Sequence, residues 1–199
     1  MIVPAEARRS RVPGARALAS SNARMLLSLS VLLGASFGAA EVAMPAFAEH
    51  HGSRAAAGLL LAAYAGGSAL GGVVLGTRTN AANARRRLWL SLTLCGLAIA
   101  PLLLARSIPA MAALMALAGL PAAPAFAAQY LLLDSVAVRG AATETFAWNS
   151  TAIFLGASIG NALGGVLIAS SSYRASLALG LAAGVASGVL AKLRGRGLS

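Results

Sequence analysis

The chain has 199 residues, of which 58% are hydrophobic and only 11% are charged, and its net charge is +11. Soluble domains contain about a quarter charged residues, so this composition excludes an ordinary soluble domain and indicates a protein embedded in a lipid bilayer. The basic residues stand between apolar stretches rather than along one helix face, which argues against a nucleic-acid partner.

Six apolar stretches are long enough, or nearly so, to cross a bilayer, which takes about 20 apolar residues. In chain order they are Met25 to Ala48, Ala55 to Thr77, Leu88 to Ala105, Pro109 to Leu133, Thr145 to Ser170 and Ala175 to Ala191. The third and the sixth are the shortest. The sequence therefore predicts an all-α integral membrane protein with one six-helix domain, residues 25–191, between an Arg-rich tail (1–24) and a short basic tail (192–199).

The basic residues are divided unequally between the two sides of the predicted membrane domain. One side holds Arg8, Arg9, Arg11, Arg16, Arg24, Arg78, Arg85, Arg86, Arg87, Arg139, Lys192, Arg194 and Arg196. The other side holds only Arg54, Arg106 and Arg174. Cytoplasmic loops carry the excess of Lys and Arg, so we predict a cell-membrane protein with both termini in the cytoplasm.

Glu41 is the one acid in the interior of the first stretch. A charge at the centre of a membrane helix costs about 2.5 to 3.5 kcal/mol on insertion scales, so we expect Glu41 to face a cavity or a partner. It is a candidate to carry a proton or to meet a cationic substrate. The alternative is a protonated carboxyl that is hydrogen-bonded between helices. Phe37 and Met44 lie within one helical turn of Glu41 and are predicted to share its face.

The first stretch also has an alternative interpretation as a secretory signal peptide. Arg-rich residues precede it, and Ala46-Phe47-Ala48 resembles a small-residue cleavage site. The apolar run is longer than an ordinary signal sequence and contains Glu41, so a retained membrane helix is favoured. Cleavage would leave the orientation of the other five helices unchanged.

Two similar glycine-rich decapeptides, Gly67 to Gly76 and Gly160 to Ala169, lie in the second and fifth stretches. They share the glycines Gly67, Gly71 and Gly72 with Gly160, Gly164 and Gly165. Because the two helices cross the membrane in opposite directions, we predict inverted repeats, residues 25–105 and 109–191. Chance similarity between Gly-rich helices is the alternative. The G-x-x-x-G spacing predicts helix faces that pack closely and can rock during gating.

The fourth stretch contains Pro121 and Pro124, which interrupt the helical hydrogen bonds near mid-membrane and predict a broken helix beside a transport path. Gln129 follows on the cytoplasmic side and is a further candidate for that path. Interior polar residues such as Tyr64 and Asn149 are expected to hydrogen-bond a neighbouring helix.

The loop after the fourth stretch carries Asp134, Arg139 and Glu144. They are candidates for a gating ion pair, although a solvated cluster is the favoured interpretation. Adjacent His50 and His51 make a poor metal site, because two neighbouring imidazoles cannot easily face one ion. No cofactor or metal is predicted.

An enzyme is not predicted either. Ser36 and Ser158 each stand in a G-x-S-x-G pattern, but the chain has histidines only in one loop, and the strand–turn–helix setting of soluble hydrolases is absent.

From about Arg24 onward the chain resembles the C-terminal six-helix half of a transporter of the major facilitator superfamily, in particular its bacterial drug- and metabolite-efflux branch. The resemblance is carried by the Gly34 to Glu49 helix, by the Gly66 to Gly76 helix with its basic loop, and by Asp134 to Gly165. It implies a secondary transporter that moves a small molecule by alternating access, with proton-coupled efflux. Helices one and four would line a cavity, two and five would face another half, and three and six would face lipid.

The resemblance also implies a partner, either a second six-helix half or a second copy of the chain. One departure is the segment from Gly72 to Asn80, which lacks the Asp of the family's inner-loop signature and leaves a gating contact there in doubt. The alternative to transport is a truncated fragment or scaffold that only packs with partner helices.

Overall fold

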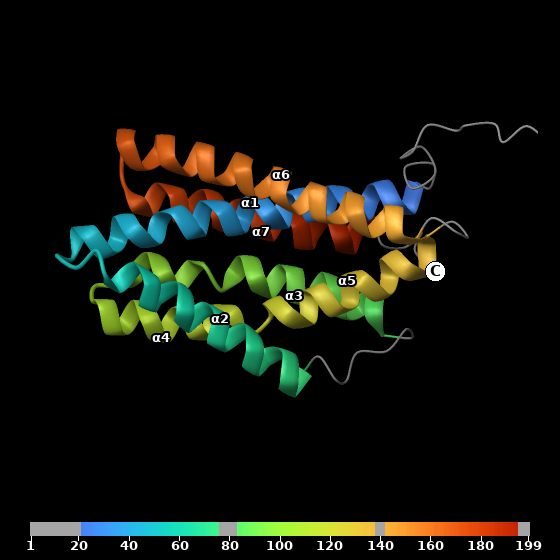
Figure 1. Cartoon of the computed structure of the whole chain (residues 1–199), viewed down its shortest axis with the longest axis horizontal. Helices are drawn as coiled ribbons and strands as arrows, with labels where there is room; N and C mark the ends of the chain where they lie inside the picture. The colour runs from blue at the N-terminus through green and yellow to red at the C-terminus, as the bar shows by residue number, and fades with distance from the viewer. Residues whose placement is uncertain (1–20, 76–82, 138–141, 195–199) are drawn as a thin grey trace, which may run out of the picture.

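A computed structural model describes residues 21–75, 83–137 and 142–194. These residues form α1 (Ser21–His50), α2 (Ala56–Leu75), α3 (Ala84–Leu97), the 3₁₀ helix η3 (Ala100–Leu104), α4 (Ile108–Gly119), α5 (Ala122–Val136), α6 (Ala142–Ser170) and α7 (Tyr173–Arg194). With α3 joined to η3 and α4 to α5, they make six spans long and apolar enough to cross a membrane (Figure 1). This confirms the predicted all-α, six-helix membrane domain. Residues 1–20, 76–82, 138–141 and 195–199, which include Arg78, Asn80 and Arg139, lie outside the described residues.

The observed helices extend beyond the apolar stretches. α1 begins at Ser21 instead of Met25, and α7 has 22 residues, running from Tyr173 to Arg194. The helical hydrogen bonds continue through polar and basic residues at the helix ends. These residues are tolerated there because a long basic side chain can extend from the helix to the membrane–water interface. The third and sixth spans, whose apolar stretches are the shortest, are thus longer in the structure, at 21 and 22 residues.

Prolines determine where two of the spans change geometry. α4 ends at Gly119, and Pro121 occupies the N-cap position of α5, so the predicted break in the fourth span is confirmed. Pro124 falls in the first turn of α5, where the missing N–H costs little. The third span was expected to be one regular helix. It tightens instead into η3, whose first turn contains Pro101.

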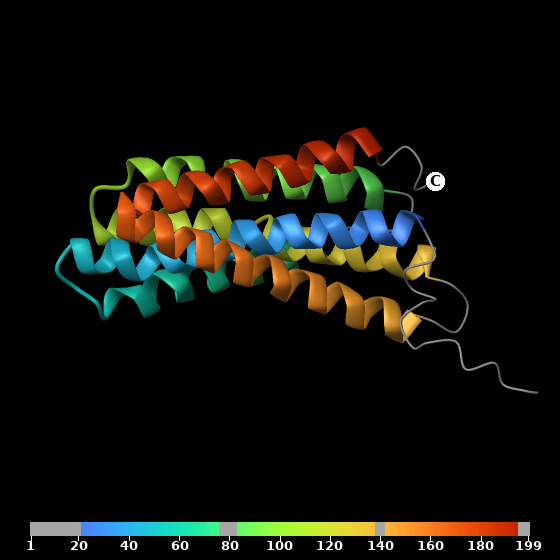
Figure 2. The same ribbon diagram turned by 90° about the horizontal axis from the view of Figure 1, so that it is seen from above.

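The helices pack in a defined set of pairs. α1 packs along α6 and α7, α2 packs along α4, and α3 packs against both α5 and α7. Figures 1 and 2 show α1 beginning and α7 ending at the same end of the bundle, here called the terminal end. Two apolar clusters fill the bundle. The cluster towards the terminal end includes Leu26, Leu88 and Leu133, and the other includes Phe47 and Leu102.

α1 and α6 contact each other backbone to backbone. A Cβ atom added to Gly34 or Gly38 of α1 would overlap the backbone of α6 at Ile153 or Ala157. Gly156 and Gly160 of α6 approach the carbonyl oxygens of Val31 and Ala35 in the same way. Glycine is required here because only a residue without a side chain allows the two helix axes to come this close.

The same construction holds α2 against α4. A Cβ atom at Gly67 or Gly71 would overlap the carbonyl oxygen of Ala116 or Leu120, and one at Gly119 would overlap that of Tyr64.

The remaining described glycines of the two decapeptides differ in their surroundings. A Cβ atom added to Gly164 would overlap the side chains of Ser176 and Val42, one at Gly72 would meet only the Cβ atom of Ala123, and Gly165 faces open space. Gly76 lies outside the described residues.

Two neighbouring glycines give a matched test of this packing. Gly67→Ala should destabilise the protein by about 1 to 3 kcal/mol, because the added methyl group forces α2 away from α4. Gly66→Ala should leave stability unchanged or raise it slightly, since a Cβ atom there meets nothing within 4 Å and alanine favours the helix. Thermal unfolding of the purified proteins in detergent measures both. Equal unfolding temperatures for the two variants would contradict the close contact.

Candidate functional site

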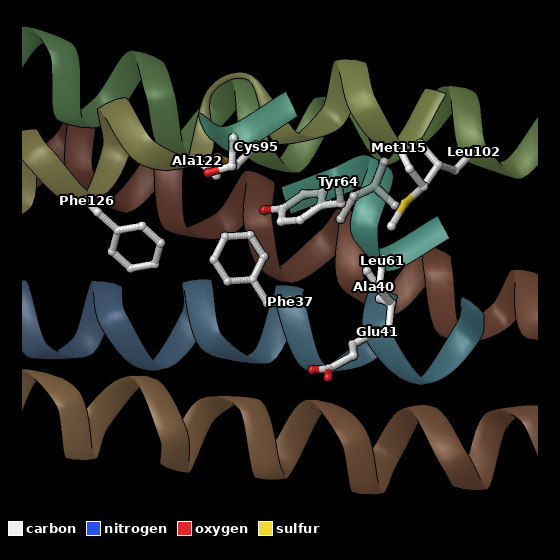
Figure 3. Close-up of a pocket in the computed structure, with 12 residues that line it drawn as sticks. Phe37, Ala40, Glu41, Leu61, Tyr64, Cys95, Leu102, Met115, Ala122 and Phe126 are labelled. Carbon is white, nitrogen blue, oxygen red and sulfur yellow. The ribbon is translucent and has the colours of Figure 1, made fainter. Parts of the chain in front are cut away.

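A cavity of about 380 Å³ opens in the middle of the bundle, between the two apolar clusters. Its walls are mostly apolar and come from α1, α2, α3, α4, α5 and the 3₁₀ segment (Figure 3). The lining residues are Phe37, Ala40, Glu41, Leu61, Tyr64, Ser68, Cys95, Ile99, Leu102, Met115, Ala122 and Phe126. A mid-bundle apolar cavity with a few polar groups is the usual form of a small-molecule site.

Both irregular spans contribute to this cavity. Met115 lines it from α4, and Ala122 and Phe126 line it from α5, on either side of the break at Pro121. Leu102 lines it from the 3₁₀ helix η3, and Ile99 lines it from the N-cap position of that helix. Irregular backbone at membrane depth is tolerated where it is buried in protein or borders a cavity, and both breaks meet that condition.

Glu41 lies at the margin of the cavity. It is exposed, and Figure 3 shows its carboxyl group directed away from the rings of Tyr64 and Phe126. No residue in the described ranges forms an ion pair or hydrogen bond with it. Glu41 thus borders the cavity, and its role as a proton or cation carrier stays a prediction.

Tyr64 supplies the second unpaired polar group. Its ring packs edge-on against Phe37, with 5.9 Å between the ring centroids. Its buried hydroxyl has no hydrogen-bond partner among the described residues. We expected Tyr64 to bond a neighbouring helix. Its hydroxyl is instead free to form a hydrogen bond with a ligand or a water molecule in the mostly apolar cavity.

Aromatic rings continue from the cavity towards the terminal end of the bundle. Successive centroid distances are 5.9 Å for Tyr64–Phe37, 6.0 Å for Phe37–Phe126, 6.4 Å for Phe126–Tyr130 and 5.7 Å for Tyr130–Phe146. Figure 3 shows the first three of these rings in a row. We call these five residues the ring row. Its members come from α2, α1, α5 and α6.

A second polar cluster lies outside the cavity. Ser30, Gln129 and Asn149 are at most 1% exposed and connect α1, α5 and α6. The Gln129 Nε2 atom donates to Ser30 Oγ and, over 3.0 Å, to Asn149 Oδ1. Ser30 Oγ also donates to Asn149 Oδ1, over 2.7 Å. Asn149 thus bonds neighbouring helices, as polar residues of membrane helices are expected to do.

The structure brings only some of the sequence-predicted path residues together. Phe37 and Glu41 line the cavity, whereas Gln129 is enclosed in the polar cluster. Met44 is fully buried in the apolar cluster far from the terminal end, and Pro121 and Pro124 are buried where α5 begins.

The loop charges and the outer histidines lie away from the cavity. Asp134 is exposed near the end of α5, Glu144 lies in the first turn of α6, and Arg139 is outside the described residues. At the opposite end Arg54 donates a hydrogen bond to Glu49, which raises the pKa of the guanidinium above its ordinary value. Within the described ranges, no three His, Cys, Asp or Glu residues are grouped to hold a metal ion.

Sequence reasoning missed most of the cavity wall, including Ser68, Cys95 and Phe126. Polarity within an apolar span was the only signal available for Ser68, and nothing in the sequence distinguished Cys95 or Phe126 from ordinary packing residues.

Comparison with known proteins identifies the family. The family model described as Major Facilitator Superfamily matches residues 26–196, which is most of the chain. A search of curated proteins finds no matching relative. Members of this family are membrane transporters rather than enzymes, and the six apolar spans agree with that class. The chain is therefore a multi-pass membrane protein that belongs to the Major Facilitator Superfamily.

Proposed function

We propose that this chain is a six-helix unit of a secondary transporter that moves a small molecule out of the cell by alternating access, driven by protons. The observation that carries the proposal is the mid-bundle cavity, whose mostly apolar wall holds the unpaired Tyr64 hydroxyl and, at its margin, the Glu41 carboxyl. Unpaired polar groups inside a membrane domain reduce its stability. In a transport site these groups would bind the transported molecule or a proton.

Glu41 is the coupling residue in this proposal. A carboxylate is much less costly in water than in an apolar enclosure, so its ionised form favours the state that admits water. Protonation favours the state in which the cavity is closed. A proton that enters from one side and leaves to the other then changes the direction in which the cavity opens.

A second six-helix unit completes the transport path. α2 and α6 bury only 17% and 22% of their apolar windows within the chain, less than any other span. They expose large apolar side chains, among them Leu70, Val73, Phe154 and Val166. This unit corresponds to the C-terminal half of the efflux-branch transporters, and the partner is either an N-terminal half or a second copy. The chain spans the plasma membrane with both termini in the cytoplasm, as the distribution of Lys and Arg favours.

The glycine pairs keep each helix pair rigid while the unit rocks against its partner. Gly67, Gly71, Gly160 and Gly164 all face helices of this chain. Gly72 and Gly165, which have more open surroundings, are the positions of the two decapeptides best placed for a moving contact. Asp134, Arg139 and Glu144 remain the candidates for a gating ion pair at the terminal end.

Alternating access can be tested without knowledge of the substrate. In a Cys95→Ala background, which removes the chain's single cysteine, Ser68→Cys places a thiol in the cavity wall. A membrane-impermeant maleimide should label this thiol in both right-side-out and inverted vesicles, because the cavity opens to each side in turn. Leu94→Cys in the same background is the control, since an exposed apolar position in contact with lipid offers no water. Labelling from one side only, or from neither, would support the non-transporting scaffold instead.

The role of Glu41 has its own test in the same assay. The rate of labelling at Ser68→Cys from at least one side should rise from mildly acidic to mildly alkaline medium, because ionised Glu41 favours the hydrated state. Glu41→Gln should remove this pH dependence and hold the rate near its acidic value. Glu49→Gln, at an exposed acid paired with Arg54, should retain the pH dependence. If Glu41→Gln also retains it, Glu41 is not the coupling residue.

A further inference from the structure

We infer that a polar pocket at the terminal end of the bundle, between the start of α1 and the end of α7, binds the headgroup of an anionic phospholipid. The pocket has a volume of about 530 Å³, and we call it the headgroup pocket. Its lining residues are Ser21, Asn22, Arg24, Met25, Ser28 and Arg194. It shares no lining residue with the mid-bundle cavity, so the inference does not depend on the proposed transport function.

The headgroup pocket lies at the level of the membrane surface. Arg24 stands directly before the first apolar stretch, which begins at Met25, and Arg194 lies in the last turn of α7. Figures 1 and 2 show both helix ends at the terminal end of the bundle. In the same turn of α7 the Lys192 ammonium lies 5.3 Å from the centroid of the Trp89 ring, and tryptophan favours the layer of the lipid headgroups. The pocket is therefore placed where the phosphate groups of a bilayer lie.

Two guanidinium groups, from the first and the last helix, give the pocket its charge. Arg24 and Arg194 line it, and no Asp or Glu is among the lining residues. Within the described ranges Arg194 forms no ion pair. The planar fork of an arginine binds two phosphate oxygens at once, so the pair favours a phosphate-bearing anion. A zwitterionic headgroup also carries a cationic amine, and the lining residues offer that amine no acidic partner.

The other lining groups suit a lipid rather than a free phosphate ion. Ser21, Asn22 and Ser28 are neutral polar residues, which can hydrogen-bond the glycerol hydroxyls of a phosphatidylglycerol headgroup. The Ser28 hydroxyl donates to the Met25 carbonyl oxygen over 2.7 Å, which leaves the lone pairs of Ser28 Oγ to accept a hydrogen bond. The half-buried Met25 side chain adds an apolar surface where the apolar stretch begins. A free phosphate ion would gain nothing from that surface.

The sequence adds positive charge on both sides of the pocket-lining segments. Four arginines precede α1 and one follows α7, namely Arg8, Arg9, Arg11, Arg16 and Arg196. Basic clusters next to a membrane helix attract anionic lipids, because the lipid surface on that side carries a negative potential. The net charge of this part of the chain thus favours the same class of ligand as the pocket does.

Orientation of the chain by positive charge is the alternative reason for these arginines. The positive-inside rule requires basic residues at the terminal end but neither a pocket nor a particular arrangement of side chains. Arg86 separates the two explanations, since it is exposed at the start of α3 and does not line the pocket. Its neutralisation removes the same charge from the same end of the bundle and should leave headgroup binding unchanged.

The dependence of stability on lipid tests the ligand class. For the full chain in a nonionic detergent, added phosphatidylglycerol should raise the unfolding temperature saturably, because a headgroup held by both α1 and α7 stabilises the folded bundle. Phosphatidylcholine should raise it by no more than about a third as much at the same concentration. Inorganic phosphate at millimolar concentration should have no effect. An equal shift with both lipids, or a shift of the same size with inorganic phosphate, would overturn the inference.

Native mass spectrometry of the same protein locates the site. Arg24→Gln and Arg194→Gln should each raise the Kd of the first bound phosphatidylglycerol by about five- to tenfold, because each removes one charge-assisted contact to phosphate. Arg194→Lys should recover part of this loss, since it restores the charge without the planar fork. Arg86→Gln is the matched control and should bind phosphatidylglycerol as the unsubstituted chain does. Equal losses in Arg86→Gln and Arg194→Gln would show attraction by net charge alone and refute the pocket as the site.

Discussion

Direct backbone contact between helices is the constraint on which the rest of this structure depends. In a bilayer, apolar side chains gain little by leaving lipid for one another, so helices associate through van der Waals contact at close range. Gly34, Gly38, Gly156 and Gly160 provide that range between α1 and α6. Because α1 is held along its glycine face, the neighbouring residues Phe37 and Glu41, at the border of that face, line the cavity.

The same device appears a second time in α2 and α4, where Gly67 and Gly71 oppose the backbone at Ala116 and Leu120. The recurrence supports the proposal of two inverted repeats more strongly than the similarity of the two decapeptides does. A sequence match between Gly-rich helices can arise by chance, whereas a shared packing geometry has a structural reason. The cavity is walled on one side by α1 and on another by α2 and α4, so two closely packed pairs frame it.

The sequence predicted features that depend on local chemistry. Six spans follow from the lengths of apolar stretches, and the break before α5 follows from the missing N–H of Pro121. The cavity wall could not be predicted in this way. Phe37, Tyr64 and Phe126 meet only because three helices pack in one arrangement, and no local pattern encodes that meeting. For the same reason Gln129, polar and beside a predicted path, is enclosed with Ser30 and Asn149 instead.

The contrast between these two polar sites bears on function. Ser30, Gln129 and Asn149 bond one another across three helices, although Gln129 Oε1 and Asn149 Nδ2 have no partner among the described residues. Tyr64 and Glu41 have no such partners within the described part of the chain, although both lie in membrane spans. Stability alone would favour phenylalanine at position 64, since an unpaired buried polar group costs about 1 to 3 kcal/mol. The Tyr64 hydroxyl and the Glu41 carboxyl both lie at the cavity, Glu41 at its margin, so in the proposed transport site a bound ligand with polar groups of its own would pair with them.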